Sequence, residues 1–232
     1  MPEESSDAAI QDVNENHSRA HSLLYLAIFL AFVIGWAFQG SRGLYESTEG
    51  RYAECARETL ASGQLLEPIL NGKSHWTKPP LTYWLIEAGL VTFGNNPWGA
   101  RAYLAIAFIL TVIAVYFAGR ALWDKETGAV AALAYATCPY PIAAAFALST
   151  DTPEAMMQSA CIACFWLAIS QNKRIFVFLM WAFFGLAVLT KGPVAVIWLF
   201  GAAPAYLLLK RDNVAFPRMI TFSGVAAFIV IG

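Results

Sequence analysis

Long apolar runs separated by short polar links fill most of this 232-residue chain. A helix that spans a membrane needs roughly 20 mostly apolar residues, because it rises about 1.5 Å per residue across a hydrocarbon core of about 30 Å. Six runs approach that length, so the pattern predicts an all-α polytopic membrane protein. The predicted spans lie near residues 23–40, 100–122, 127–148, 154–170, 175–190 and 193–209.

The two ends of the chain differ from this pattern. Residues 1–21 are polar and mostly acidic and show no apolar periodicity, which predicts a disordered tail. No small-residue cleavage site follows the first apolar run, so we interpret that run as an uncleaved span. The last run, 219–232, is too short to cross the hydrocarbon core, which indicates a sequence cut inside a seventh span.

Residues 41–98 form the longest stretch that is not simply hydrophobic, and function concentrates in such segments. Within this first loop, residues 49–61 have the periodicity of an amphipathic helix that could lie on the membrane surface. The Asn-Gly pair at 71–72 predicts a turn. The Pro-Pro pair at 79–80 predicts the start of a second helix that reaches residue 93, because proline is tolerated in a first helical turn.

Basic residues in the short links predict the orientation, because cytoplasmic loops carry an excess of Lys and Arg. We expect a cytoplasmic N-terminus, which places most of the basic links inside. Loop 41–98 and the links 149–153 and 190–193 then share the outer face, so three separated polar segments meet at an extracytoplasmic site. The basic residues predicted to lie inside are Arg120, Lys125, Lys173, Arg174, Lys210, Arg211 and Arg218.

Composition supports the membrane class and excludes one kind of partner. Hydrophobic residues make up 58% of the chain and charged residues 13%, whereas about a quarter of an ordinary globular chain is charged. The net charge of -1 offers no concentrated basic face for nucleic acid, so we expect no nucleic-acid partner. The four cysteines predict no disulfide framework, and we interpret the pair Cys161 and Cys164 as helix packing rather than a metal or redox site.

Ionisable residues on the predicted outer face are the candidates for chemistry, since charges at membrane level are costly. Asp151 and Lys191 stand out because each is isolated in a tight link between two long apolar runs. A lysine or arginine can hold a phosphate, and a carboxylate can act as a general base or bind a divalent cation. Together they suit an anionic lipid-phosphate ligand. Other loop charges are interpreted mainly as solvated surface, namely Glu54, Arg57, Glu58 and Lys73.

Five sequence blocks, in order, resemble the aminoarabinose-transferase-like and protein-mannosyltransferase-like branch of the GT-C membrane glycosyltransferases. The first block, EGRYAECARE at 49–58, is similar to that branch's E-[GA]-R-Y-A-E-x-A-R-E signature, and KPPLTYWL at 78–85 is similar to its K-P-P-L-x-Y-W-L. The resemblance runs from about residue 41 to 200. The remaining blocks are 93–95 with Arg101, the Asp-containing loop at 148–153 and the L-T-K-G-P link at 189–193.

The resemblance implies a GT-C-type transmembrane helix bundle with surface helices in the first extracytoplasmic loop, of which this chain is the N-terminal part. It implies inverting transfer of a sugar from a polyprenyl- or dolichyl-phosphate donor to a hydroxyl of a lipid, glycan or protein acceptor. The expected location is the cell (inner) membrane, among membrane lipids. By motif position, the implied catalytic residues are Glu49, Glu46 and Asp151, and the implied donor-phosphate ligands are Arg51, Lys78, Arg101 and Lys191.

Two positions depart from the family pattern. Aminoarabinose transferases usually have Asp immediately before the motif Glu, where this chain has Thr48, and Glu immediately before the motif Lys, where it has Thr77. The second position is associated with metal in that family. We therefore expect Glu49 or Glu46 to supply the carboxylate, expect no certain cofactor while a divalent metal stays open, and do not expect aminoarabinose as the sugar.

A transporter or lipid flippase, or a noncatalytic fragment, is the alternative class. A transporter should show charges or broken helices near the membrane midplane, often in repeated halves. The sequence C-P-Y-P at 138–141 breaks one predicted span, but no second half repeats it and mid-span charges are missing. The glycosyltransferase reading is therefore favoured.

Overall fold

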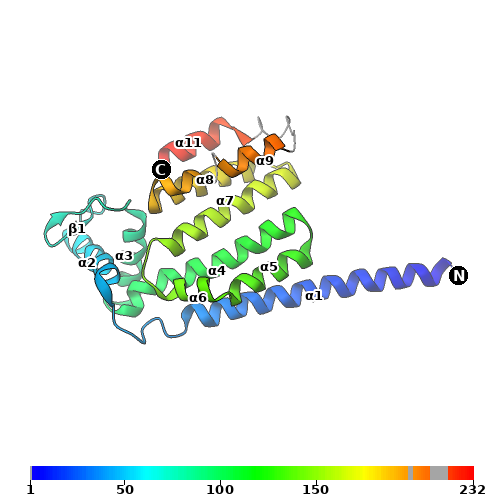
Figure 1. Ribbon diagram of the computed structural model, residues 1–232, viewed down its shortest axis with the longest axis horizontal. Coiled ribbons are helices and arrows are strands. Elements are labelled where there is room, and N and C mark those ends of the chain that lie inside the picture. The colour runs from blue at the N-terminus through cyan, green and yellow to red at the C-terminus, as the bar shows by residue number, and fades with distance from the viewer. Residues whose placement is uncertain (1, 198–200, 210–218) are drawn as a thin grey trace.

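The computed structural model describes residues 2–197, 201–209 and 219–232, and most of these residues are helical. The long helices lie alongside one another, and the short elements of the first loop gather at one end of this bundle (Figure 1). In chain order the elements are α1 (Pro2–Trp36), α2 (Glu46–Ser62), β1 (Ile69–Leu70), β2 (Lys73–Ser74), α3 (Leu81–Phe93), α4 (Pro97–Leu122), α5 (Lys125–Thr137), α6 (Pro139–Phe146), α7 (Asp151–Gln171), α8 (Arg174–Lys191), the 3-10 helix η1 (Pro193–Ala195), α9 (Ala203–Leu209) and α11 (Phe222–Ile231).

Helix α1 packs along the side of the bundle and carries the N-terminus beyond it (Figure 1). The sequence predicts a disordered tail over residues 1–21, whereas α1 is continuous from Pro2 to Trp36. A helix nucleated by the apolar segment extends into adjoining residues without a second nucleation cost, and Ala, Glu and Gln in this stretch have good helix propensity.

Three of the described helices are long and apolar enough to cross a membrane. They are residues 18–36 of α1, α4 and α8, and the bent pair α5–α6 makes a fourth if it counts as one span. Helix α7 covers the predicted span 154–170 but is not among them, because Glu154 and Gln158 in its first turns lower its hydropathy. It lies between α4 and α8, where protein rather than lipid surrounds its polar residues. The predicted span 193–209 falls partly outside the described residues, and its visible part includes η1 and α9.

The predicted break at 138–141 is confirmed. Helices α5 and α6 meet at an angle of 55°. Cys138 has extended backbone and Pro139 begins α6, where its missing N–H is not needed for a helical hydrogen bond. The chain then leaves α6 at Phe146 and enters the short link that leads to α7.

The predicted loop 41–98 contains the two predicted helices, as α2 and α3, with a two-stranded hairpin between them. The turn between β1 and β2 is the predicted Asn71-Gly72 pair, and both of its residues have positive φ. The carboxylate of Glu58 accepts hydrogen bonds of 3.0 Å from both turn amides. Glu58 therefore holds the hairpin against α2, which is a structural role.

Helix α4 is the centre of the bundle and packs against α1, α3, α5 and α7. It begins at the N-cap Asn96, whose side chain accepts a 2.9 Å hydrogen bond from the Gly99 amide, and Pro97 occupies its first turn. A Cβ added at Gly89 of α3 would lie only 2.2 Å from the Gly99 carbonyl oxygen. Small residues allow such close backbone approach in membrane bundles, and here they seat α3 directly on α4.

Candidate functional site

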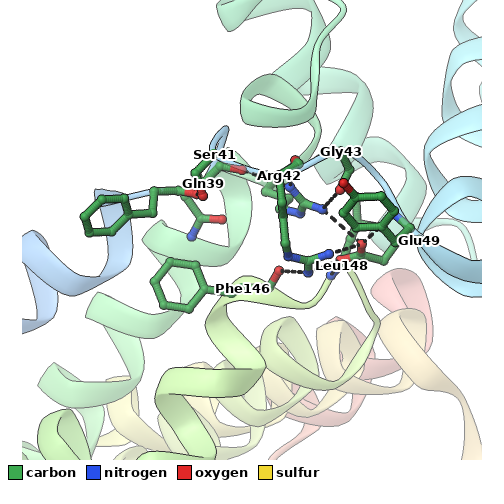
Figure 2. A network of polar contacts seen from close by, with 10 residues as sticks. Gln39, Ser41, Arg42, Gly43, Glu49, Phe146 and Leu148 are labelled. Carbon is green, nitrogen blue, oxygen red and sulfur yellow. Dashed lines mark hydrogen bonds and ion pairs between the residues drawn. The ribbon is translucent and has the colours of Figure 1, made fainter.

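The Glu49 carboxylate is the centre of a buried polar network that joins three parts of the chain. Arg42 donates to both of its oxygens, at 2.7 and 2.8 Å, and Arg101 donates to Oε2 at 2.9 Å. Backbone amides of Tyr45 and Leu148 donate at 3.2 and 2.8 Å. Figure 2 shows Arg42 and Glu49 directed at one another beside the link that contains Phe146 and Leu148. Every lone-pair direction of Glu49 is thus engaged within the protein.

These contacts keep Glu49 ionised. Burial alone would raise its pKa, but hydrogen bonds from Arg42, the Leu148 amide and Arg101, with the charge of Arg101, lower the pKa to about 2. A general base works best with a pKa near the operating pH and with an accessible oxygen. Glu49 has neither property, so its geometry favours a structural role over the catalytic role that the motif implies.

Arg101 is placed away from any external ligand. Its side chain is 1% exposed, and its guanidinium donates to the carbonyl oxygens of Gln39, Arg42 and Gly43 at 2.8 to 3.0 Å as well as to Glu49. The terminal nitrogens are therefore used to bind the first-loop backbone. This arrangement argues against the predicted phosphate-binding role of Arg101, because the only guanidinium nitrogen without a partner among the described residues, Nε, is itself buried.

The same network positions the link between α6 and α7. Arg42 donates 2.7 Å to the Phe146 carbonyl, and the Leu148 amide binds Glu49. Tyr103 of α4 donates its hydroxyl to the Ser149 carbonyl at 2.8 Å. The link thus has little freedom up to the point where α7 begins at Asp151. The predicted convergence of the first loop with this link is confirmed.

Asp151 is an exposed carboxylate at this end of the bundle, and its partner is Lys191. The Lys191 ammonium at the end of α8 donates to Asp151 Oδ1 and lies 3.5 Å from Glu154 Oε2. The Asp151 side chain remains 53% exposed, whereas that of Lys191 is 24% exposed. The two residues that the sequence singled out are therefore in direct contact, although 40 positions separate them.

The K-P-P block and the L-T-K-G-P block also meet here. Gly192 follows α8 with φ 81°, a conformation that glycine adopts readily, and a Cβ placed on it would lie 3.9 Å from Pro79 Cγ. Thr82 of α3 donates a long 3.5 Å hydrogen bond to the Thr190 carbonyl. Lys78 is half-buried and precedes Pro79 directly in sequence, so its backbone lies near the end of α8.

Arg51 and Tyr52 bring α2 to the same region. The Arg51 guanidinium carbon lies 5.5 Å from the centre of the Tyr52 ring, and Arg51 is exposed while Tyr52 is buried. Burial raises the pKa of Tyr52, the Arg51 charge opposes that shift, and the Asp151 charge adds to it. Tyr52 also packs in one buried cluster with Tyr103 and Leu148, which places this face of α2 beside the link that leads to Asp151.

The remaining predicted site residue, Glu46, begins α2, but its side chain lies outside the described residues. Within the described part of the chain, no three His, Cys, Asp or Glu side chains converge as a metal site. Asp151 and Glu154 share the ammonium of Lys191. Sequence reasoning missed Arg42 and Glu154, although Arg42 lies four residues before Glu46 and Glu154 lies three residues after Asp151, so each stands close to a residue that the motifs had singled out.

Two solved structures are similar to this chain over most of its length. ArnT from Cupriavidus metallidurans in the apo state is 28% identical with a TM-score of 0.84, over 91% of this chain and 40% of ArnT. The same protein bound to undecaprenyl phosphate gives a TM-score of 0.81 at 28% identity, over 89% of this chain and 39% of that one. The bundle and the charged site at its loop end thus define an all-α membrane protein of the GT-C class.

Residues 77–232, well over half of the chain, match the family described as dolichyl-phosphate-mannose-protein mannosyltransferase, and the chain belongs to this family. An undecaprenyl phosphate-alpha-4-amino-4-deoxy-L-arabinose arabinosyl transferase of Pseudomonas savastanoi pv. phaseolicola is 30% identical over 93% of this chain and 40% of the relative. An uncharacterized protein of Aquifex aeolicus is 28% identical over 82% of this chain and 38% of the relative. The chain spans about two fifths of the length of these relatives.

Proposed function

We propose that this chain belongs to a glycosyltransferase that moves a sugar from a polyprenyl-phosphate-linked donor to a hydroxyl acceptor on the extracytoplasmic side of the cell membrane. The observation that carries the proposal is the contact between Asp151 and Lys191 beside the K-P-P block. This contact brings an exposed carboxylate and a lysine from separate blocks together, close to the block that contains Lys78, at the loop end of a membrane bundle. A carboxylate for an acceptor hydroxyl and cations for a phosphate are the groups that this reaction requires.

In the proposed reaction the acceptor oxygen bonds to the anomeric carbon while the bond from that carbon to the carrier phosphate oxygen breaks. The acceptor proton passes to the Asp151 carboxylate, and the polyprenyl phosphate leaves as an anion. Lys191, Lys78 and the exposed Arg51 are proposed to hold that phosphate. Attack opposite to the leaving group inverts the anomeric centre.

The proposal shifts two roles relative to the motif analysis. Glu49 and Arg101 are proposed as structural residues that position the link before Asp151, because their polar groups are hydrogen-bonded within the protein. Asp151 then supplies the reactive carboxylate. A lipid-phosphate donor is supported by the similar ArnT structure that holds undecaprenyl phosphate. The sugar and the acceptor stay open to a lipid, a glycan or a protein.

The test is transfer of radiolabelled sugar from undecaprenyl-phosphate-linked donors in membranes that contain the full-length protein. Asp151→Asn and Lys78→Ala should each lower the transfer rate at least tenfold, because each removes a group that acts on the transition state. Lys73→Ala, in the exposed hairpin, is the matched lysine control and should leave transfer unchanged.

Normal transfer by both site variants would overturn the residue roles. If the unaltered protein released no polyprenyl phosphate from any donor but accelerated movement of the lipid across vesicle bilayers, the enzyme proposal itself would fail. The flippase alternative would then be favoured. The 55° break between α5 and α6 is consistent with that alternative.

A further inference from the structure

We infer that Glu154 is a positioning residue, which holds Lys191 in place while the donor phosphate takes over the contact that Lys191 makes with Asp151. The inference rests on the proposed function, because it assumes that Lys191 binds the donor phosphate. Glu154 stands outside every block that carries the family resemblance.

Glu154 is a buried carboxylate in the first turn of α7, only 8% exposed. Its Oε2 lies 3.5 Å from the Lys191 ammonium, and its Oε1 accepts a 2.6 Å hydrogen bond from Gln158 one turn further along the helix. A buried carboxylate is costly unless it is paired and hydrogen-bonded. Glu154 has both kinds of partner and is therefore fixed in position.

One lysine thus faces two carboxylates of different character. The Asp151 side chain is 53% exposed and can turn toward solvent or substrate, whereas that of Glu154 is 10% exposed and is held by Gln158. An arriving phosphate competes with Asp151 for the Lys191 ammonium, because the more exposed Asp151 carboxylate can be hydrated once its ion pair with Lys191 breaks. Lys191 then stays with Glu154 and the phosphate, and Asp151 is freed to accept the acceptor proton.

The arrangement predicts the sign of a charge-removing change. If Glu154 only repelled the anionic lipid, Glu154→Gln would tighten its binding. If Glu154 positions Lys191, the same change leaves Lys191 paired with Asp151 alone. The lysine is then less well placed for the phosphate, and phosphate binding weakens. The two roles therefore give opposite results.

The experiment measures binding of undecaprenyl phosphate, without sugar, to the purified full-length protein in detergent. Glu154→Gln should raise the Kd roughly fivefold or more, in the range of contacts between neighbouring residues. Gln158→Leu removes the hydrogen bond that fixes Glu154 but leaves all charges, so it should raise the Kd by a smaller factor. Glu54→Gln, an exposed carboxylate of α2, is the matched control and should leave the Kd unchanged.

A double-mutant cycle with Lys191→Met decides whether Glu154 acts through the lysine. In the Lys191→Met background, Glu154→Gln should no longer change the Kd. An undiminished effect in that background would overturn the inference, as would tighter or unchanged binding in both Glu154→Gln and Gln158→Leu.

These outcomes are separate from failure of the proposed function. If the unaltered protein does not bind undecaprenyl phosphate, the proposed donor is wrong and Glu154 has no such role. If the unaltered protein binds it and Lys191→Met weakens binding while the Glu154 and Gln158 variants do not, the proposed function stands and only the positioning role is lost.

Discussion

The backbone amide of Leu148 donates a 2.8 Å hydrogen bond to Oε1 of Glu49, which is 99 positions earlier in the chain. This bond ties the first residues of α2 to the link that leads to Asp151. Arg42 reinforces the tie by binding both Glu49 and the Phe146 carbonyl. The motif glutamate therefore shapes the site through the backbone that it holds, and the exposed carboxylate is supplied by another segment.

Replacing Glu49 should destabilise the protein. Glu49→Gln leaves the buried guanidinium of Arg101 without its counter-charge, and breaking a buried ion pair by removing one partner costs about 3–5 kcal/mol. We expect a clearly lower unfolding temperature in detergent. Glu54→Gln is the matched control, since its partner Arg57 is exposed and such surface pairs contribute little. Equal unfolding temperatures for the two variants would contradict a structural role for Glu49.

Acid should act on the same carboxylate. The pKa of Glu49 falls from an ordinary 4.5 to about 2, so its stabilising contribution is complete above 4.5 and is lost as the pH falls from 4.5 through about 2. The stability difference between the unaltered protein and Glu49→Gln should therefore shrink over that window. Denaturant midpoints measured from pH 6 down to pH 2 test this, and a constant difference would refute it.

Glu87 should show the opposite dependence on pH. It is 5% exposed, its Oε1 has no hydrogen-bond partner among the described residues, and burial raises its pKa to about 7. Between 4.5 and 7 the unfolded chain releases this proton while the folded chain keeps it, so stability falls as the pH rises through that window. Glu87→Gln should match the unaltered protein at pH 4.5 and unfold at a higher temperature at pH 8.

Glu126→Gln provides the carboxylate control for Glu87, because Glu126 lies at the start of α5 in a surface pair with Arg19. Its unfolding temperature should follow that of the unaltered protein at both pH values. A Glu87→Gln variant that gained nothing at pH 8 would show that the Glu87 carboxyl carries no burial cost.

The contact between α3 and α4 predicts a glycine that tolerates no side chain. Gly89→Ala places a Cβ 2.2 Å from the Gly99 carbonyl oxygen, so the helices must separate, at a cost of about 1–3 kcal/mol. Gly50→Ala in α2 is the matched control, since nothing lies within 4 Å of its added Cβ and alanine favours a helix by up to about 1 kcal/mol. In thermal unfolding, the midpoint temperature should be lower for Gly89→Ala than for the unaltered protein, whereas that of Gly50→Ala should not fall.

The predicted orientation can be tested by labelling. A cysteine at Lys73 in the hairpin should react with a membrane-impermeant maleimide in intact spheroplasts, because we expect that loop outside. A cysteine at Arg120, exposed at the far end of α4, should react only after lysis. Both changes are made with Cys138→Ala, since Cys138 is itself exposed. The reverse labelling pattern would show that the orientation is opposite to the predicted one and that the proposed site faces the cytoplasm.

The sequence alone determined where most helices lie and that the first loop meets the link before Asp151. Apolar runs of spanning length predicted α4 and α8, the Asn-Gly pair predicted a turn, the Pro-Pro pair predicted the start of α3, and the C-P-Y-P segment predicted the break between α5 and α6. The two strands that flank the turn were not predicted. The predicted features depend on local propensity and on length, which neighbouring residues encode. The polar residues 2–21 nevertheless belong to α1, because helix propagation from the adjoining apolar segment depends on more than local polarity.

Only the tertiary structure decided which partners each charge has and how exposed it is. Glu49 and Asp151 are both carboxylates in motif blocks of one sequence, yet Glu49 is bound by Arg42, Arg101 and a distant amide, while Asp151 stays exposed beside Lys191. Apart from Arg42, which is 7 positions from Glu49, these partners lie 52, 99 and 40 positions away. A carboxylate's ionisation and reach depend on its burial and its neighbours in space, and those are set by how the helices pack.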